Sequence, residues 1–211
     1  MIGIFGGTFD PIHLGHLRTV LDVQEVLGLE TVRFIPSAAP PHRDTPDVSA
    51  EQRAAMTRLA IEGQTGFVYD GRELERDGRS YTVLTLESLR KELGGKQPMC
   101  LIVGTDAFLG FPSWHRWEEL LLLCNVAVMV RPGYHLDPAA FPTGWLSQHL
   151  RDAHDWNSTE SAGQVVEVPV TQLEISATDI RQRLAAGRNI RYLVPEPVRH
   201  YILEQGLYNQ L

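Results

Sequence analysis

The sequence predicts an α/β protein with a doubly wound, Rossmann-like, mostly parallel sheet and a small helical segment at its C-terminus. Short β-rich apolar runs alternate with helical patterns, which is typical of parallel βαβ units. The 211 residues suffice for one well-buried domain, and a hydrophobic content of 43% is ordinary for a folded protein. We therefore expect one domain over residues 1–211, with a helical C-terminal portion over about 176–211.

The predicted strands are apolar runs that end at glycine, proline or polar residues. They cover residues 2–5, 31–36, 66–70, 99–104, 125–130 and 165–170. Helical patterns between them cover 15–27, 49–62, 82–93 and 117–124, and residues 145–150 could form one short helix. In such a sheet, ligands bind at the carboxyl ends of the strands where the strand order reverses.

A further helix is predicted near the C-terminus. Ser176 followed three residues later by Asp179 has the spacing of a capping box, with Asp in place of Glu, and Gly187 marks the end of the helix. Arg181 then lies on the first turns, beside amides that favour an anion. Taken alone, the segment also fits an ordinary capped helix with a solvated arginine.

The first apolar run leads into a phosphate-site pattern. Paired glycines, Gly6 and Gly7, let the backbone pass close to a bulky polar ligand. His13 and His16 are three residues apart and face the same way on a beginning helix. Helix N-terminal amides and imidazole donors can hold a triphosphate without a lysine. The alternatives are a surface histidine pair and a metal site, although no H-E-x-x-H follows and no cysteine lies near.

Two other nucleotide motifs are absent from the chain. Neither G-x-G-x-x-G nor G-x-x-x-x-G-K-[ST] occurs, which argues against hydride transfer on a dinucleotide and against P-loop hydrolysis. A net charge of −7 argues against a non-specific nucleic-acid surface, which would need a broad field of Lys and Arg.

Cysteine usage and hydropathy point to a soluble cytoplasmic protein. Cys100 and Cys124 lie inside apolar runs, so we expect buried free thiols. The N-terminus lacks a basic region followed by an apolar stretch, and no run approaches 18 apolar residues, so no membrane association is expected.

Residues 6–16 resemble the (T/H)xGH signature of the nucleotidyltransferases that share a fold core, the HUP type, with class I aminoacyl-tRNA synthetases. Residues 175–181 resemble the ISxTxIR motif of bacterial-type nicotinate-nucleotide adenylyltransferases, and residues 191–202 look like that family's C-terminal helix. The resemblance implies transfer of the adenylyl group of ATP to nicotinate mononucleotide, giving nicotinate adenine dinucleotide and pyrophosphate in NAD biosynthesis. It also implies Mg²⁺, bound mainly through ATP phosphates rather than by protein ligands.

The resemblance also assigns site residues. The catalytic set would be His13, His16 and Arg181, which stabilise the transferring and leaving phosphates. The ATP-binding set is Gly6, Gly7, Thr8, Phe9, Gly104, Asp106, Ile175, Ser176 and Thr178. The mononucleotide-binding set is Arg43, Thr82, Trp114 and His115.

Particular chemistry is expected of three of these residues. Asp106 can accept hydrogen bonds from two ribose hydroxyls. Arg43, in a PPHR loop, can bind phosphate in a bidentate manner. Trp114 can stack on the pyridine ring. His115 stands where relatives often carry an aromatic residue. The structural alternatives are a turn or helix cap for Asp106, a solvated loop arginine for Arg43 and a core or rim aromatic for Trp114.

The expected reaction needs no protein base, because a phosphate monoester is already an anionic nucleophile near neutral pH. Positioning and charge stabilisation suffice. Alternatives within the class are adenylyltransferases acting on nicotinamide mononucleotide or on phosphopantetheine. A non-catalytic nucleotide-binding protein is the alternative from another class. A homo-oligomer is compatible with the sequence, which does not fix the oligomeric state.

Overall fold

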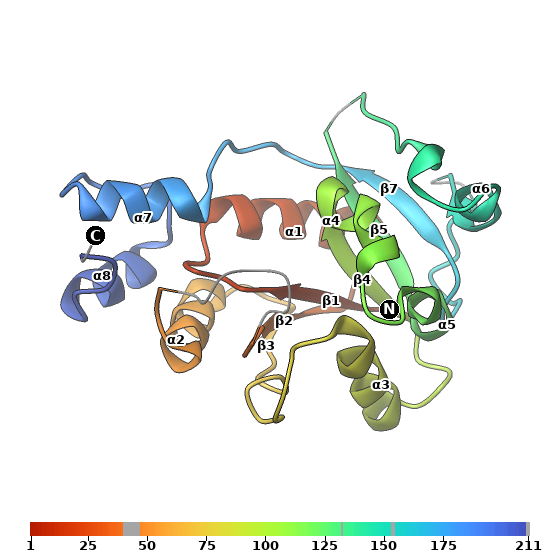
Figure 1. Cartoon of the computed structure of the whole chain (residues 1–211), viewed down its shortest axis with the longest axis horizontal. Coiled ribbons are helices and arrows are strands. Elements are labelled where there is room, and N and C mark those ends of the chain that lie inside the picture. The colour runs from red at the N-terminus through yellow and green to blue at the C-terminus, as the bar shows by residue number, and fades with distance from the viewer. Residues whose placement is uncertain (40–46, 132, 153–154, 210–211) are drawn as a thin grey trace.

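The computed structural model describes residues 1–39, 47–131, 133–152 and 155–209. In this part of the chain, strands form one sheet in the order β3-β2-β1-β4-β5-β7-β6, with every neighbouring pair parallel (Figure 1). The strands are β1 Ile2–Gly7, β2 Thr31–Pro36, β3 Phe67–Tyr69, β4 Met99–Gly104, β5 Asn125–Val130, β6 Leu150–Arg151 and β7 Val165–Pro169. The predicted doubly wound parallel fold is confirmed.

The helices agree with the sequence patterns in most places. They are α1 Leu14–Leu27, α2 Ala50–Ile61, α3 Thr82–Leu93, α4 Thr105–Leu109, α5 Leu120–Leu123, α6 Trp145–His149, α7 Ala177–Ala185 and α8 Glu196–Glu204. The stretch predicted over 117–124 is instead a 3₁₀ turn followed by the short α5. The two-residue β6 and the short α4 were not predicted, because neither is long enough to show a hydrophobic period.

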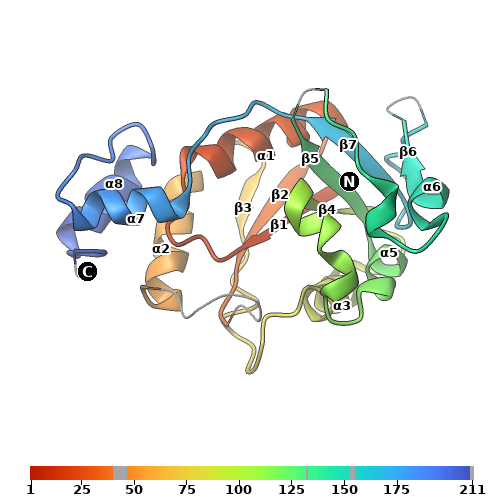
Figure 2. The ribbon, with the colours of Figure 1, turned by 45° about the horizontal axis from the view of Figure 1, so that its top comes forward.

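Helices cover both faces of the sheet. Successive strand residues point to opposite faces, so Phe5 packs in the core beneath α1, whereas Ile4 packs in the core beneath α3. Helices α7 and α8 lie together at one end of the molecule, beside α2 (Figures 1 and 2). Their residues Ile180 and Val198 are buried in the same core as Phe5.

The strand order reverses beside β1. From β1 the chain adds β2 and β3 outward on one side and then returns to place β4 against the other side of β1. The loops that follow β1, β2 and β4 therefore meet at one edge of the sheet, where such folds bind ligands.

The two cysteines are free and buried, as predicted. Burial raises the pKa of the Cys100 thiol and raises that of Cys124 to about 12. None of the helices in the described part of the chain combines the length and apolar character that crossing a bilayer requires.

Candidate functional site

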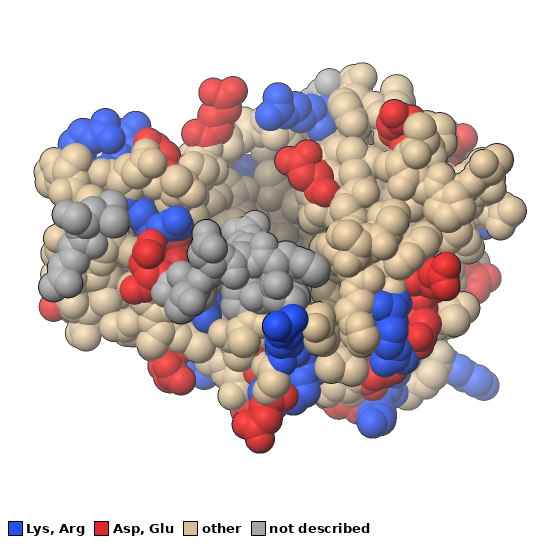
Figure 3. All heavy atoms as spheres, viewed as in Figure 1, with Lys and Arg blue, Asp and Glu red and all other residues tan. Residues whose placement is uncertain are grey.

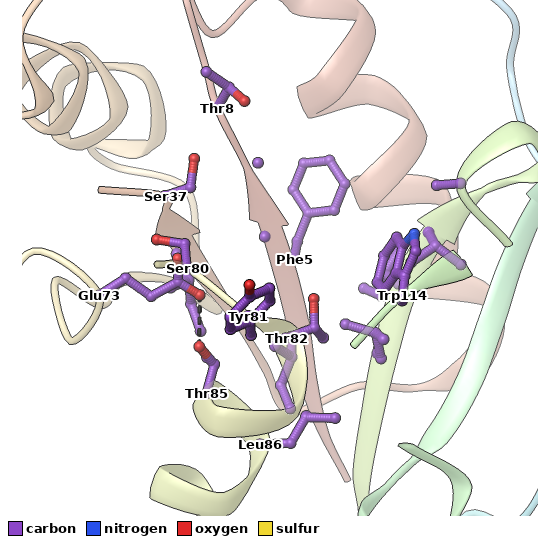
Figure 4. A pocket seen from close by; sticks show the side chains of 18 of the residues that line it. Phe5, Thr8, Ser37, Glu73, Ser80, Tyr81, Thr82, Thr85, Leu86 and Trp114 are labelled. Atoms are coloured by element: carbon purple, nitrogen blue, oxygen red, sulfur yellow. Dashed lines mark hydrogen bonds between the residues drawn. The ribbon is translucent and has the colours of Figure 1, made fainter. Parts of the chain in front are cut away.

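A cavity of about 460 Å³ opens at the carboxyl ends of β1, β2 and β4. The face of the molecule seen in Figure 3 is hollowed near its middle, between the regions of α7 and α4. Predicted residues from three distant segments line the cavity: Gly6, Gly7, Thr8, Thr82, Gly104, Trp114 and His115. The close-up in Figure 4 shows Thr82 and Trp114 beside β1, with Thr8 further along the same chain segment.

The aromatic part of the cavity is built from two short segments. Tyr81, just before α3, lies with its ring centroid 4.4 Å from that of His115. Trp114 packs on Phe111, with centroids 4.7 Å apart. Thr82 is the first residue of α3, so its amide is one of those that a helix leaves without an intrahelical partner. An aromatic wall thus lies next to an anion-favouring helix start.

The two histidines stack on each other at the start of α1. Their ring centroids are 3.6 Å apart at an angle of 23°, and the backbone N–H of His13 donates to Nδ1 of His16 at 3.3 Å. Only 6% of His13 is exposed, and burial lowers the pKa of its imidazole to about 4. His13 is therefore a neutral hydrogen-bonding group at neutral pH, and not a cation.

Arg181 joins the C-terminal segment to the loop before α1. Its Nη1 donates to the carbonyl oxygen of Asp10 at 2.8 Å, and its Nε pairs with Asp47 at 2.5 Å. The predicted helix cap is present, since Ser176 Oγ accepts from the N–H of Asp179 at 3.1 Å. The reciprocal half of the capping box is not seen, because the Asp179 carboxylate pairs with Arg183 at 2.6 Å.

Several predicted residues do not line the cavity, and the predicted catalytic set of His13, His16 and Arg181 is among them. Phe9 is 3% exposed, and its ring packs against Phe5 and Phe34, so its side chain belongs to the core. Asp106 is exposed on the first turn of α4, next to the lining residue Gly104. Ile175, Ser176 and Thr178 lie at or just before the start of α7 rather than on the cavity wall. Arg43 lies outside the described residues.

Gly15 explains how closely the C-terminal segment approaches α1. A Cβ at this position would lie 3.0 Å from Nδ1 of His13 and 3.5 Å from the carbonyl oxygen of Ile175. The contact with Ile175 would be an ordinary one, whereas the His13 ring would have to shift by a few tenths of an ångström. Ile175 is therefore placed beside the histidine pair, even though it lies outside the cavity.

Sequence reasoning missed a buried arginine beneath the cavity. Arg53 of α2 is 1% exposed. Its Nη1 donates to the carbonyl oxygens of Thr8 and Ser37, both at 2.7 Å, and its Nη2 to that of Ala38 at 3.2 Å. The available signal was its position three residues before Met56, on the buried face of the helix.

A buried carboxyl group on the cavity wall was also missed. Glu73 accepts a hydrogen bond from Thr85 Oγ1 at 2.6 Å, and burial raises its pKa. Nearby, Ser80 Oγ accepts from the N–H groups of Ala38 and Ala39 at 3.0 and 3.3 Å. These bonds join the segment before α3 to the end of β2. No sequence pattern marked Glu73.

Asp10 connects the loop before α1 to the end of the described chain. Its Oδ1 accepts from the hydroxyl of Tyr208 at 2.7 Å, and its Oδ2 accepts from the N–H of Asp47 at 3.1 Å. Burial raises the pKa of Tyr208. The phenol therefore stays protonated and donates to the carboxylate.

Unsatisfied polar atoms gather at this end of the sheet. Within the described residues, four buried side-chain atoms have no hydrogen-bond partner. Three of them are here, His13 Nδ1, Ser37 Oγ and Arg53 Nε, and the fourth, Trp156 Nε1, is in the segment before β7. Buried polar groups in folded proteins are nearly always paired. Such a cluster beside a cavity favours a polar ligand as the missing partner.

Comparisons with known proteins agree with this geometry. The model of the cytidylyltransferase-like family matches residues 4–183. A probable nicotinate-nucleotide adenylyltransferase of Pseudomonas putida (strain W619) is 50% identical over 98% of this chain and 94% of its own length. A probable nicotinate-nucleotide adenylyltransferase of Pseudomonas aeruginosa (strain UCBPP-PA14) is 45% identical over 98% of this chain and 96% of its own length. In fold, the chain resembles a Plasmodium falciparum nicotinic acid mononucleotide adenylyltransferase complexed with NaAD, with a TM-score of 0.73 and 18% sequence identity. The match covers 100% of this chain and 98% of that one.

Proposed function

Because the chain belongs to the cytidylyltransferase-like family, and within it to the nicotinate-nucleotide adenylyltransferases, we propose that it transfers the adenylyl group of ATP to nicotinate mononucleotide. The products are nicotinate adenine dinucleotide and pyrophosphate. The observation that carries the proposal is that one cavity joins the glycines at the end of β1 to the aromatic wall around Trp114. One end suits phosphates and the other suits a flat ring, which is the arrangement that two nucleotide substrates require.

Phosphates of ATP would lie at the start of α1. The helix N-terminus favours an anion, and His13, His16 and Arg181 supply hydrogen-bond donors around it. Arg181 would exchange its pairing with Asp47 for phosphate oxygens, which neutralises charge on the transferring and leaving groups. The mononucleotide phosphate attacks the α-phosphorus directly, so these residues position and stabilise charge rather than move protons.

A divalent ion, Mg²⁺ in this proposal, would be bound mainly by ATP. Within the described residues, no group of three or more His, Cys, Asp or Glu side chains could hold a metal ion. Substrate phosphate oxygens would therefore supply most of the ligands, and the ion would neutralise charge on the triphosphate.

The pyridine ring would occupy the aromatic end of the cavity. Its ring would stack on Trp114, and its carboxylate would face the free amides at Thr82 and the segment at His115. A helix N-terminus favours an anionic carboxylate over a neutral carboxamide. We therefore expect nicotinate mononucleotide to be preferred to the nicotinamide form.

The decisive assay compares the two mononucleotides. The protein is mixed with ATP and Mg²⁺, then with nicotinate or nicotinamide mononucleotide, and pyrophosphate release is measured. We expect faster release with the nicotinate form. Equal rates would refute the acid preference, and no release with either would refute the proposed activity.

A pair of tryptophan variants tests the placement of the ring. Trp114→Ala should raise the KM for the mononucleotide by about fivefold, since stacking contributes about 1 kcal/mol. Trp117→Ala is the matched control, because Trp117 packs on Phe141 and Trp145 and does not line the cavity. An equal KM in both variants would place the ring elsewhere.

A further inference from the structure

We infer that Arg53 is a positioning residue for adenylyl transfer: it sets the two substrates relative to each other by tying together the loops that follow β1 and β2. The inference rests on the proposed function. Arg53 itself does not line the cavity, so it acts through the residues that it holds.

The hydrogen bonds of Arg53 cross from the segment that follows β1 to the segment that follows β2. A single nitrogen, Nη1, donates to the carbonyl oxygens of both Thr8 and Ser37 at 2.7 Å. Thr8 belongs to the glycine turn on the ATP side, whereas Ser37 follows β2, and both line the cavity. The distance between the two loops therefore depends on the guanidinium group of Arg53.

The segment after β2 is held from two sides. Arg53 donates hydrogen bonds to the carbonyl oxygens of Ser37 and Ala38. Ser80 Oγ accepts hydrogen bonds from the N–H groups of Ala38 and Ala39. Ser80 also donates its own N–H to the carbonyl oxygen of Ala39 at 3.0 Å. Ser80 lies two residues before Thr82, the first residue of α3, where the pyridine carboxylate is expected. The segment after β2 is therefore connected to the start of α3 through Ser80.

A guanidinium is required for this geometry. Its planar fork holds several acceptors in fixed directions, whereas a lysine ammonium is a point charge on a flexible stem. Within the part of the chain described, no carboxylate pairs with Arg53, and its three partners are all backbone carbonyl oxygens. An apolar group of similar volume would leave these three carbonyl oxygens without their donor.

The test replaces Arg53 by Lys and, separately, by Met. Loss of the bridge leaves each substrate's own contacts but misplaces the substrates relative to each other. We therefore expect kcat to fall by about 100-fold while both KM values change little, since a misplacement of about 1 Å costs that much. Each variant is assayed well below its own Tm, so that the folded fraction does not limit turnover.

Arg90 provides the matched control. It also donates to backbone carbonyl oxygens, those of Leu123, Gln97 and Ser161, but it does not line the cavity and its bonds reach neither cavity loop. Arg90→Lys should lower Tm and leave kcat unchanged. If Arg53→Lys also keeps the wild-type kcat below its Tm, Arg53 has only a structural role and the inference is overturned.

Hydrogen exchange separates failure of the inference from failure of the proposed function. Peptides covering residues 5–9 and 34–39 should exchange faster in Arg53→Lys than in the wild type and should be unaffected in Arg90→Lys. A wild-type protein that releases no pyrophosphate would refute the proposed function, and the exchange rates would still decide whether Arg53 fixes the two loops. Unchanged exchange in Arg53→Lys would overturn the inference in either case.

Discussion

The buried imidazole of His13 should make the stability of the folded protein depend on pH. Burial lowers its pKa from 6.5 to about 4 in the folded chain, whereas the ring regains its ordinary pKa when the chain unfolds. Between these two values the unfolded state binds a proton that the folded state excludes. Acidification therefore favours unfolding, and the contribution of a neutral His13 to stability is lost as the pH falls below 6.5.

The size of the effect follows from the two pKa values. At pH 7 the ring is mostly neutral in both states, so its protonation lowers the free energy of unfolding by only about 0.2 kcal/mol. At pH 5 the unfolded ring is almost fully protonated and the folded ring is still neutral. His13 should therefore lower the free energy of unfolding by about 2 kcal/mol between pH 7 and pH 5.

Urea unfolding at both pH values measures this difference. His13→Asn removes the titrating ring and keeps a side chain favoured at an N-cap. The wild type should lose about 2 kcal/mol more than this variant on going from pH 7 to pH 5. His200→Gln, which removes an exposed imidazole from α8, controls for the loss of one histidine. Equal losses in the wild type and in His13→Asn would refute the reasoning.

Three further outcomes are expected. His16→Ala should lower pyrophosphate release by about 10²- to 10³-fold with an unchanged circular dichroism spectrum, and a near wild-type rate would contradict its role. Tyr208→Phe leaves the buried Asp10 carboxylate one hydrogen bond short and should lower the free energy of unfolding in urea by about 1–3 kcal/mol, which an unchanged midpoint would disprove. Cys100 and Cys124 should react with a thiol reagent only after denaturation, and rapid reaction of the native protein would show that they are not buried.

The sheet could be predicted from sequence because its strands carry their own signals. Residues 31–36, 99–104 and 125–130 are apolar runs bounded by polar or turn residues, and all three strands have the predicted bounds. The two-residue β6 carries no such signal, since two residues show no alternation and the strand exists only through pairing with β7.

The site was only partly predictable for a different physical reason. Glycine turns and helix caps are local, so the sequence marks Gly7 and Ser176 directly. Arg53 bonds to Thr8, 45 positions away, and Glu73 bonds to Thr85, 12 positions away, whereas a charged residue in a helix or loop usually faces solvent. Their burial is a property of the assembled loops, which only the three-dimensional structure displays.

The hydrogen bond between Asp10 and Tyr208 has a consequence for how the protein is made. The two residues are 198 positions apart, so the loop that begins the site emerges from the ribosome long before the phenol that holds its carboxylate. Because a domain generally folds as a unit, contacts between distant segments form only after both segments have left the ribosome. The loop that holds Asp10 therefore gains this contact late, and a nascent chain should acquire nucleotide affinity only after Tyr208 has left the ribosome.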